Sequence, residues 1–247
     1  MGNIYNFKIL KSQKLIHGVS TKFFGSIKTN GNINESNLKG FLDTLGIDRK
    51  NTFFPEQIHG SNVVTIDDSR KQIILNADGL ITNKKNVFLG IVTADCLPVI
   101  FYGEKKGIVG IAHAGYKGLL SGILEEMLKV MKKMGAYVKN MKIAIGPAIG
   151  VCCYDVSYDR VRMFVGFEGD SGRTSLARMT NLYQVRNGKY FLDLKNIAKQ
   201  IFISEGILEK NIEVSDICTY DNIKDFFSFR GEGPKNFGEF VTVVGRV

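Results

Sequence analysis

The 247-residue chain contains no tryptophan, four prolines, four cysteines and only three histidines. So few imidazoles exclude a multinuclear copper centre that needs many histidine ligands. No run of 18 uncharged apolar residues occurs, so no membrane span is expected. The first residues also lack the apolar core of a secretory signal, and we expect a cytoplasmic protein.

The four cysteines do not form a disulfide framework. They lie at 96, 152, 153 and 218, and the neighbours Cys152 and Cys153 are poorly placed to bridge each other. Reduced thiols, or one thiolate bound to a metal, are the states that suit a cytosolic chain. We expect Cys152 and Cys153 to be packing residues rather than metal ligands.

The net charge of +9 permits nucleic-acid binding. However, the lysine pairs at 84–85, 105–106 and 132–133 are scattered, and no aromatic-basic RNA-binding signature is found. We therefore expect solvated lysine faces and a small anionic substrate, with neither nucleic acid nor membrane as a partner. The oligomeric state is left open between monomer and homodimer.

Hydrophobic periodicity predicts a mixed chain of helices and strands, without internal repeats, in a single domain over 1–247. Helical spacing predicts helices over 34–46, 118–134 and 190–206. Strands are predicted over 5–10, 15–24, 62–66, 72–82, 87–93, 98–102, 107–114, 142–146, 212–218 and 239–247. The run 87–93 is continuously apolar, which is typical of a strand buried on both faces. The runs 98–102 and 107–114 flank a short turn and predict a hairpin.

Three residues that could bind a metal stand next to predicted strand ends. His113 ends the strand 107–114 and precedes a glycine-containing turn, Cys96 follows the strand 87–93, and His59 stands beside a glycine before another strand. Taken singly, each has an ordinary explanation as a core histidine, a buried inert cysteine or a loop histidine. Taken together, they offer zinc two imidazole nitrogens and one thiolate, with a fourth position left for water. Asp95, adjacent to Cys96, is a candidate for proton transfer.

The motifs "QIHGSNVV", "ADGLIT", "TADCLPVIFY", "AHAGYKG", "GPAIGVCCYDV" and "FFSFR" occur in an order that resembles the YfiH, or laccase-domain, family. The resemblance implies an α+β fold, built as a four-layer α/β/β/α sandwich with mixed sheets. It also implies a zinc-type site at His59, Cys96 and His113, with copper as a possible alternative metal. The activity implied is phosphorolysis of adenosine, inosine and methylthioadenosine, with adenosine deaminase activity beside it. In that reading Asp95, Cys96 and His113 are the catalytic residues.

Five further residues are candidates for holding purine nucleosides and phosphate: Lys22, Tyr116, Lys117, Phe227 and Arg230. Lys22 and Lys117 stand where the family usually has arginine, and Tyr116 where it usually has tryptophan. Lysine keeps the charge but loses the planar fork that matches phosphate oxygens. We expect phosphate at the start of the predicted helix 118–134, with Lys117 nearby. Phe227 would stack on a base, and Arg230 would hold substrate oxygens.

Three alternatives to the purine nucleoside activity stay open. A copper-dependent polyphenol oxidase fits a site of one cysteine and two histidines, although three histidines cannot supply a trinuclear copper cluster. A peptidoglycan-precursor editing hydrolase would use the same metal. A non-catalytic, metal-stabilised module that binds anionic polymers is permitted by the charge, and salt-sensitive binding without nucleoside turnover would identify it.

Overall fold

Two six-stranded sheets form the centre of the molecule. The computed structural model describes residues 4–29, 31–67, 72–165 and 181–247. The first sheet has the order β1 (Ile4–Tyr5), β2 (Leu15–Ser20), β17 (Phe240–Arg246), β9 (Phe88–Thr93), β5 (Thr52–Pro55) and β7 (Ile73–Ile74). The second has the order β16 (Ile212–Val214), β12 (Lys142–Ile145), β10 (Leu97–Gly103), β11 (Ile108–Ala114), β8 (Gly79–Thr82) and β6 (Val63–Thr65). Both sheets are mixed, because β5 is parallel to its neighbours in the first sheet and β12–β16 and β6–β8 are parallel in the second.

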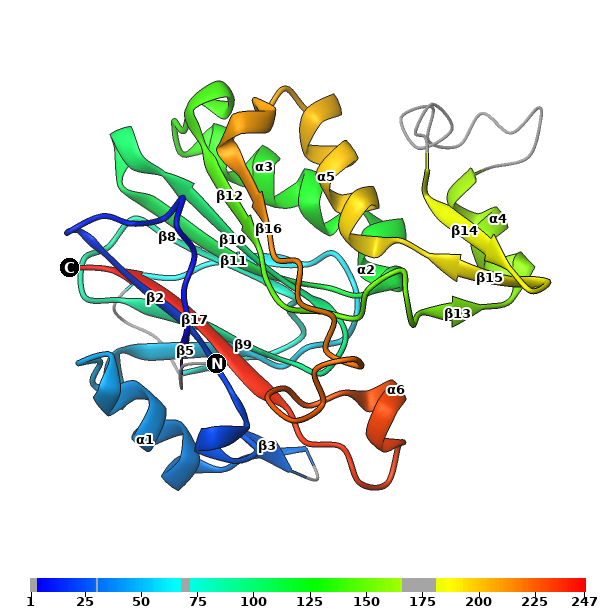
Figure 1. Cartoon of the computed structure of the whole chain (residues 1–247). Coiled ribbons are helices and arrows are strands. Elements are labelled where there is room, and N and C mark those ends of the chain that lie inside the picture. Colours follow the sequence, from blue (N-terminus) through cyan, green and yellow to red (C-terminus); the bar gives the residue numbers. More distant parts are fainter. Residues whose placement is uncertain (1–3, 30, 68–71, 166–180) are drawn as a thin grey trace.

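Helices cover the outer faces of the two sheets (Figure 1). On the side of the first sheet lies α1 (Glu35–Thr44), and on the side of the second lie α2 (Tyr116–Ser121), α3 (Ile123–Lys133) and α5 (Leu194–Ser204). Smaller elements lie at the periphery: α4 (Tyr158–Val165), α6 (Phe229–Glu232), a sheet of β13 (Asp155–Val156), β15 (Lys189–Leu192) and β14 (Tyr183–Arg186), and the pair β3 (Lys28–Thr29) and β4 (Asn32–Ile33). The four-layer order α/β/β/α agrees with the predicted α+β fold.

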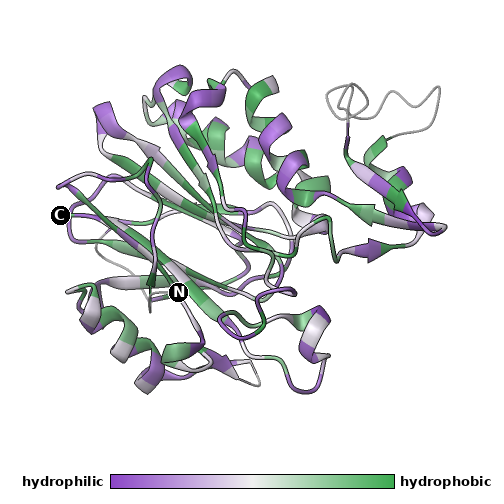
Figure 2. Ribbon diagram, viewed as in Figure 1, coloured by the Kyte–Doolittle hydropathy of each residue, from purple (hydrophilic) through white to green (hydrophobic). Residues whose placement is uncertain are grey.

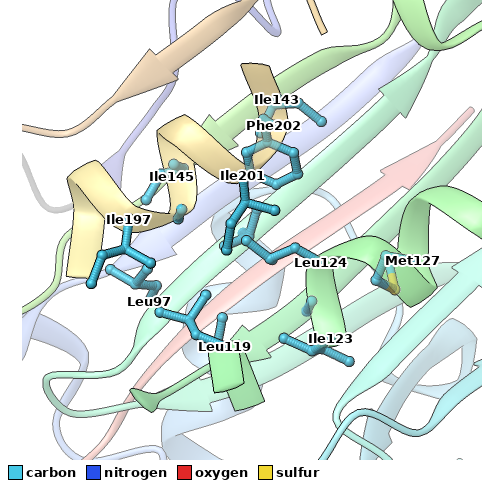
Figure 3. Packing of buried hydrophobic residues seen from close by; sticks show 14 of the residues in the cluster. Leu97, Leu119, Ile123, Leu124, Met127, Ile143, Ile145, Ile197, Ile201 and Phe202 are labelled. Carbon is cyan, nitrogen blue, oxygen red and sulfur yellow. The ribbon is translucent and has the colours of Figure 1, made fainter. Parts of the chain in front are cut away.

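Three apolar clusters fill the spaces between these layers. One lies between the two sheets and includes Leu89 and Ile111, and a second lies between α1 and the first sheet. The third lies between the second sheet and its helices, where Leu124 of α3 and Ile201 of α5 lie in the same apolar layer (Figure 3). Figure 2 shows the apolar sides of these helices turned toward the sheets. Burial of these faces is the main contribution to holding the layers together.

Several predicted elements are confirmed. The strand 87–93 is observed as β9, which is buried along its whole length, and the hairpin 98–102/107–114 is observed as β10 and β11. The helix 34–46 is observed as α1, whose Asn34 accepts a hydrogen bond from the Asn37 amide at 3.1 Å and so caps the first turn. The predicted strands 62–66, 142–146 and 239–247 are also present.

The predicted helix 118–134 is wrong as one helix. Gly122 adopts a left-handed conformation, with φ of 84°, and divides the segment into α2 and α3. Apolar periodicity alone did not reveal this break, because Leu119, Ile123 and Leu124 all face the same core. The segment that contains Lys117 is therefore the six-residue helix α2 rather than the long helix expected.

Several other predicted helices and strands are shorter in the structure than expected. The predicted strand 5–10 is observed only as the short strand β1. Phe7 and Leu10 are buried, but they lie in the irregular segment after β1 and not in a strand. The run 72–82 divides into β7 and β8, which belong to different sheets, with a positive φ of 53° at Asn76 between them. The predicted helix 190–206 begins as β15, and α5 starts only after its cap Asp193. The strands 15–24 and 212–218 end early, at Ser20 and Val214.

His17 in β2 is a partly buried imidazole away from the metal-ligand candidates. Its Nε2 accepts a hydrogen bond from the Phe7 amide at 3.0 Å, and its Nδ1 is buried without a hydrogen-bond partner among the described residues. Burial lowers the pKa of His17 below its ordinary value, despite the opposing effect of the Glu213 carboxylate. The folded protein therefore favours the neutral imidazole.

We expect His17 to make the protein less stable in mild acid. Because the folded pKa lies below the unfolded value of about 6.5, the stability that neutral His17 contributes is lost as the pH falls below that value. The Tm of the wild type should therefore fall more between pH 7 and pH 5 than that of His17→Gln, whose amide does not titrate. Parallel Tm-against-pH curves for the two proteins would contradict this expectation.

Candidate metal centre and substrate pocket

Strand pairing brings Cys96 and His113 together. Pro98 of β10 pairs with His113 of β11, and Leu97 with Ala114, so Cys96 in the preceding turn lies across from Gly115. The thiol of Cys96 can lie this close only because residue 115 is glycine, since a Cβ placed there would lie 2.8 Å from Cys96 Sγ. Gly115, two residues after His113, therefore makes room for the thiol.

His59 completes the cluster from a loop between β5 and β6. The residue has a φ of 60°, unusual for a side chain other than glycine, and its ring lies edge-to-face with that of His113 at 4.7 Å between centroids. The potential donor atoms of His59, Cys96 and His113 all lie within 4.8 Å of one another. Tetrahedral zinc with Zn–S near 2.3 Å and Zn–N near 2.0 Å needs donor separations of about 3.3–3.8 Å, so small movements would suffice.

Asp78 connects the two histidines. Its fully buried carboxylate accepts hydrogen bonds from the backbone amides of His59 at 2.9 Å and Gly60 at 2.7 Å. The same carboxylate lies 2.9 Å from His113 Nδ1. This contact assigns the Nδ1 proton to the Asp78 side and leaves Nε2 of His113 for the cluster, as in the carboxylate–histidine–metal arrangement.

Charge interactions stabilise an ion pair between Cys96 and His113. Burial by itself would raise the pKa of the Cys96 thiol, but the positive His113 ring and hydrogen bonds from both imidazoles lower it to about 7. Burial would lower the pKa of His113, but the Cys96 thiolate and the Asp78 carboxylate raise it to about 9. Without a metal the cluster thus favours the thiolate, which is the form that binds metals, and a bound metal would displace the Nε2 proton of the charged His113 ring.

The cluster opens into a cavity of about 530 Å³, a size ordinary for a small-molecule site. Aromatic and charged side chains share its wall. The aromatic residues are Tyr116, Tyr154, Phe229 and Phe237, the cationic ones Lys28, Arg160 and Arg230, and the acidic ones Asp95 and Glu239. The cavity therefore combines flat apolar surfaces with charges of both signs.

Arg160 and Arg230 are both held against aromatic rings. The Arg160 guanidinium lies 4.3 Å from the Tyr116 ring centroid. Arg230 donates from Nη1 to the Asp155 carboxylate at 2.6 Å and lies 5.4 Å from the Tyr154 ring centroid. These contacts fix the direction in which each guanidinium is presented.

Asp95 lines the cavity, but hydrogen bonds engage both of its carboxylate oxygens. One oxygen accepts from Thr219 Oγ1 at 2.6 Å, and the other accepts from the backbone amide of Arg230 at 2.7 Å. The backbone of Asp95 has a φ of 87° in the turn before Cys96. The residue thereby ties the β9–β10 turn to the segment that carries Arg230.

The structure brings most of the predicted site residues together, but not all. His59, Asp95, Cys96, His113, Tyr116 and Arg230 all line the cavity. Lys22 instead forms an ion pair with Glu232 at 2.7 Å and lies over the Phe227 ring, and neither Lys22 nor Phe227 is among the lining residues. Lys117 is exposed and also lies outside the lining.

Sequence reasoning gave no role to several residues of the site, among them Lys28, Asp78, Arg160, Phe237 and Glu239. Asp78 was visible within the motif "ADGLIT" but had no stated role. Arg160 lies on α4, where only tertiary packing brings it to the cavity. Glu239 is a half-buried carboxyl group, and burial raises its pKa although Lys28 and the two site histidines oppose the effect.

We expect Asp78→Asn to weaken metal binding. The amide keeps the size of the carboxylate but not its charge, and it cannot accept all the hydrogen bonds from His59, Gly60 and His113. Loss of such a supporting group typically lowers metal affinity about 10–100-fold. Competition with a chromophoric chelator measures the change. Asp43→Asn, which alters an exposed side chain of α1, is the control. Unchanged metal affinity in folded Asp78→Asn would contradict the role given to Asp78.

Known proteins resemble this chain over most of its length. The family model described as multi-copper polyphenol oxidoreductase laccase matches residues 17–247. Purine nucleoside phosphorylase YlmD of Bacillus subtilis is 32% identical over 244 residues, covering 92% of this chain and 84% of the relative. Adenosine deaminase RL5, from an unknown prokaryotic organism, is 28% identical, covering 76% and 73%. The crystal structure of Bacillus licheniformis YfiH superimposes with a TM-score of 0.83 at 28% identity, covering 94% of this chain and 92% of that one. The chain belongs to the laccase-domain family that includes YfiH and YlmD.

Proposed function

We propose that the protein is a zinc-dependent purine nucleoside enzyme that carries out phosphorolysis of adenosine, inosine and methylthioadenosine and deamination of adenosine. The observation that carries the proposal is the His59–Cys96–His113 cluster in the wall of an aromatic and cationic cavity. The names of the YlmD and RL5 relatives support the same substrate class.

The donor set fits zinc. One thiolate and two imidazoles, oriented by Asp78, are three protein ligands, and a catalytic zinc usually keeps its fourth position open. Bound there, zinc would supply Lewis acidity, lowering the pKa of water to about 7 or polarising a substrate oxygen. A copper-dependent oxidase could use the same three ligands, but His17 is the one remaining histidine and is not among the lining residues.

Aromatic rings in the cavity suit a purine base. Phe229 and Phe237 lie edge-to-face, 4.9 Å between ring centroids, and Tyr116 and Tyr154 contribute further rings. A flat heterocycle gains stacking and dispersion energy against such surfaces. We therefore propose that Phe229 and Tyr116 bind the base, rather than Phe227, which is not among the residues that line the cavity.

Phosphate is best accommodated by the cations that face the cavity. Arg160 and Lys28 line it, whereas Lys22 is paired with Glu232 and Lys117 is exposed. The Arg160 guanidinium has the planar fork that matches phosphate oxygens. In phosphorolysis, phosphate held by these side chains would attack the anomeric carbon, giving the free base and ribose 1-phosphate.

Glu239 is the carboxyl group best suited to move a proton. It lines the cavity, whereas both oxygens of Asp95 already accept hydrogen bonds. In deamination, water replaces the amino group of adenosine: Glu239 would accept a proton from the attacking water and donate it to the amino group, which leaves as ammonia. Asp95 would then act by positioning Arg230 and the turn that carries Cys96.

Product analysis tests the function directly. The zinc-loaded protein is incubated with adenosine in the presence and absence of phosphate. We expect adenine and ribose 1-phosphate only with phosphate, and inosine under both conditions. Arg160→Lys should raise the KM for phosphate without changing the rate of inosine formation. Absence of both products from zinc-loaded protein would contradict the proposal, and oxidation of phenols by a copper-loaded sample would favour the oxidase.

Replacement of the proton-transfer group is the second test. Glu239→Gln should lower kcat for deamination by about 10²–10⁴, the usual contribution of general acid–base catalysis, while zinc content stays unchanged. Glu209→Gln, which alters an exposed carboxylate, is the control. A Glu239→Gln enzyme with wild-type kcat would return the proton-transfer role to Asp95.

A further inference from the structure

A second cluster of potential metal ligands lies outside the metal centre described above, and it includes Cys152 and Cys153, which the sequence led us to expect as packing residues. The donor atoms of Cys152, Cys153, Cys218 and Asp221 all lie within 4.8 Å of one another. The Asp221 carboxylate accepts from the thiols of Cys152 at 3.1 Å and Cys153 at 3.0 Å. The four potential metal ligands, three of them sulfur, therefore lie close enough together to bind a single metal ion.

Two turns from distant parts of the chain form this cluster. Cys152 and Cys153 lie in the turn after β12, and Cys218 lies in a bridge that pairs it with Ala148. The backbone amide of Gly150 donates to Cys218 Sγ at 3.2 Å, which supports negative charge on that sulfur. Gly150 also leaves room for the sulfurs, because a Cβ there would lie 2.9 Å from Cys152 Sγ.

We propose that Cys152, Cys153, Cys218 and Asp221 bind a second zinc ion in a closed, structural site. Four protein ligands with a majority of thiolates are the donor set of structural zinc, in contrast to the three ligands of the catalytic type. Tetrahedral zinc needs donor separations of about 3.5–3.8 Å between sulfur or oxygen ligands. The donors here lie within 4.8 Å of one another, and Asp221 lies 3.1 Å and 3.0 Å from two of the thiols, so small movements would suffice. The positive charge of Lys195 near Cys218 and Cys152 offsets part of the negative charge of such a site.

The second zinc would join two segments that both supply the substrate cavity. The segment around Cys152 and Cys153 also carries Ile149 and Tyr154, which line the cavity. The segment that begins at Cys218 carries Thr219, which binds Asp95, and leads to Arg230. Cys152 and Cys218 lie about 66 residues apart in the sequence. A metal bound to both would close the loop of chain between them and fix the positions of the two segments that line the cavity.

Cobalt spectroscopy tests the site in the full-length chain. In Cys96→Ala, the sulfurs left for a cobalt–thiolate charge-transfer band are those of Cys152, Cys153 and Cys218, because the chain has four cysteines. We expect this variant, kept reduced, to bind one Co²⁺ with that band and with the visible spectrum of tetrahedral cobalt, and Zn²⁺ to displace it. Adding Cys218→Ser should abolish the tetrahedral spectrum, and circular dichroism checks that the double variant is folded.

A pair of nearby carboxylates supplies a matched control. Asp221→Asn in the Cys96→Ala background should weaken Co²⁺ binding at least tenfold, whereas Asp216→Asn, an exposed acid five residues earlier, should not change it. Wild-type protein should contain two zinc ions per chain by elemental analysis, and Cys218→Ser should contain one. Failure of folded Cys96→Ala to bind Co²⁺ would overturn the proposal. So would a Cys218 disulfide that forms in a cytosol-like glutathione buffer despite equimolar zinc.

Discussion

The buried carboxylate of Asp78 is the group on which the candidate metal centre depends. It binds the backbone of the His59 loop and the ring of His113, which come from different parts of the chain. An ionised group in a fully buried position is tolerated only when hydrogen bonds compensate for the loss of water. Here those hydrogen bonds also set the conformation of a histidine with a positive φ and the tautomer of another. One electrostatic requirement therefore aligns both imidazoles.

Cys96 and Asp95 illustrate how neighbours in one turn take separate tasks. The Cys96 thiol faces the two histidines, whereas the Asp95 side chain faces Thr219 and the amide of Arg230. The turn thus links the metal ligands to the segment that bears Arg230 and Phe229. The hydrogen bonds of Asp95 to Thr219 and to the Arg230 amide therefore fix the distance between the metal centre and Arg230.

The sequence predicted those helices and strands whose residue pattern is local to one segment. Features that depend on contacts between distant segments could not be predicted in this way. The continuous apolar run of β9 and the capped helix α1 were readable from local patterns. The convergence of His59, Cys96 and His113 was implied mainly by the family resemblance, because their spacing alone is a weak signal. Gly122 interrupts an apolar stripe that continues on both sides, so periodicity could not locate the break. Arg160 and Glu239 reach the cavity from α4 and from the residue before β17, and no local motif records that approach. Lys22 was misleading because its charge is neutralised by Glu232, a residue 210 positions away.

The chain crosses from the first sheet to the second at both ligand-bearing turns. His59 lies between β5 and β6, and Cys96 lies between β9 and β10, whose members belong to different sheets. Cys96 and His113 already meet within the β10–β11 hairpin, whereas His59 joins them from the segment that leaves the first sheet after β5. A chain that had formed only this hairpin would therefore offer two ligands rather than three, and the complete set requires the segments that connect both sheets.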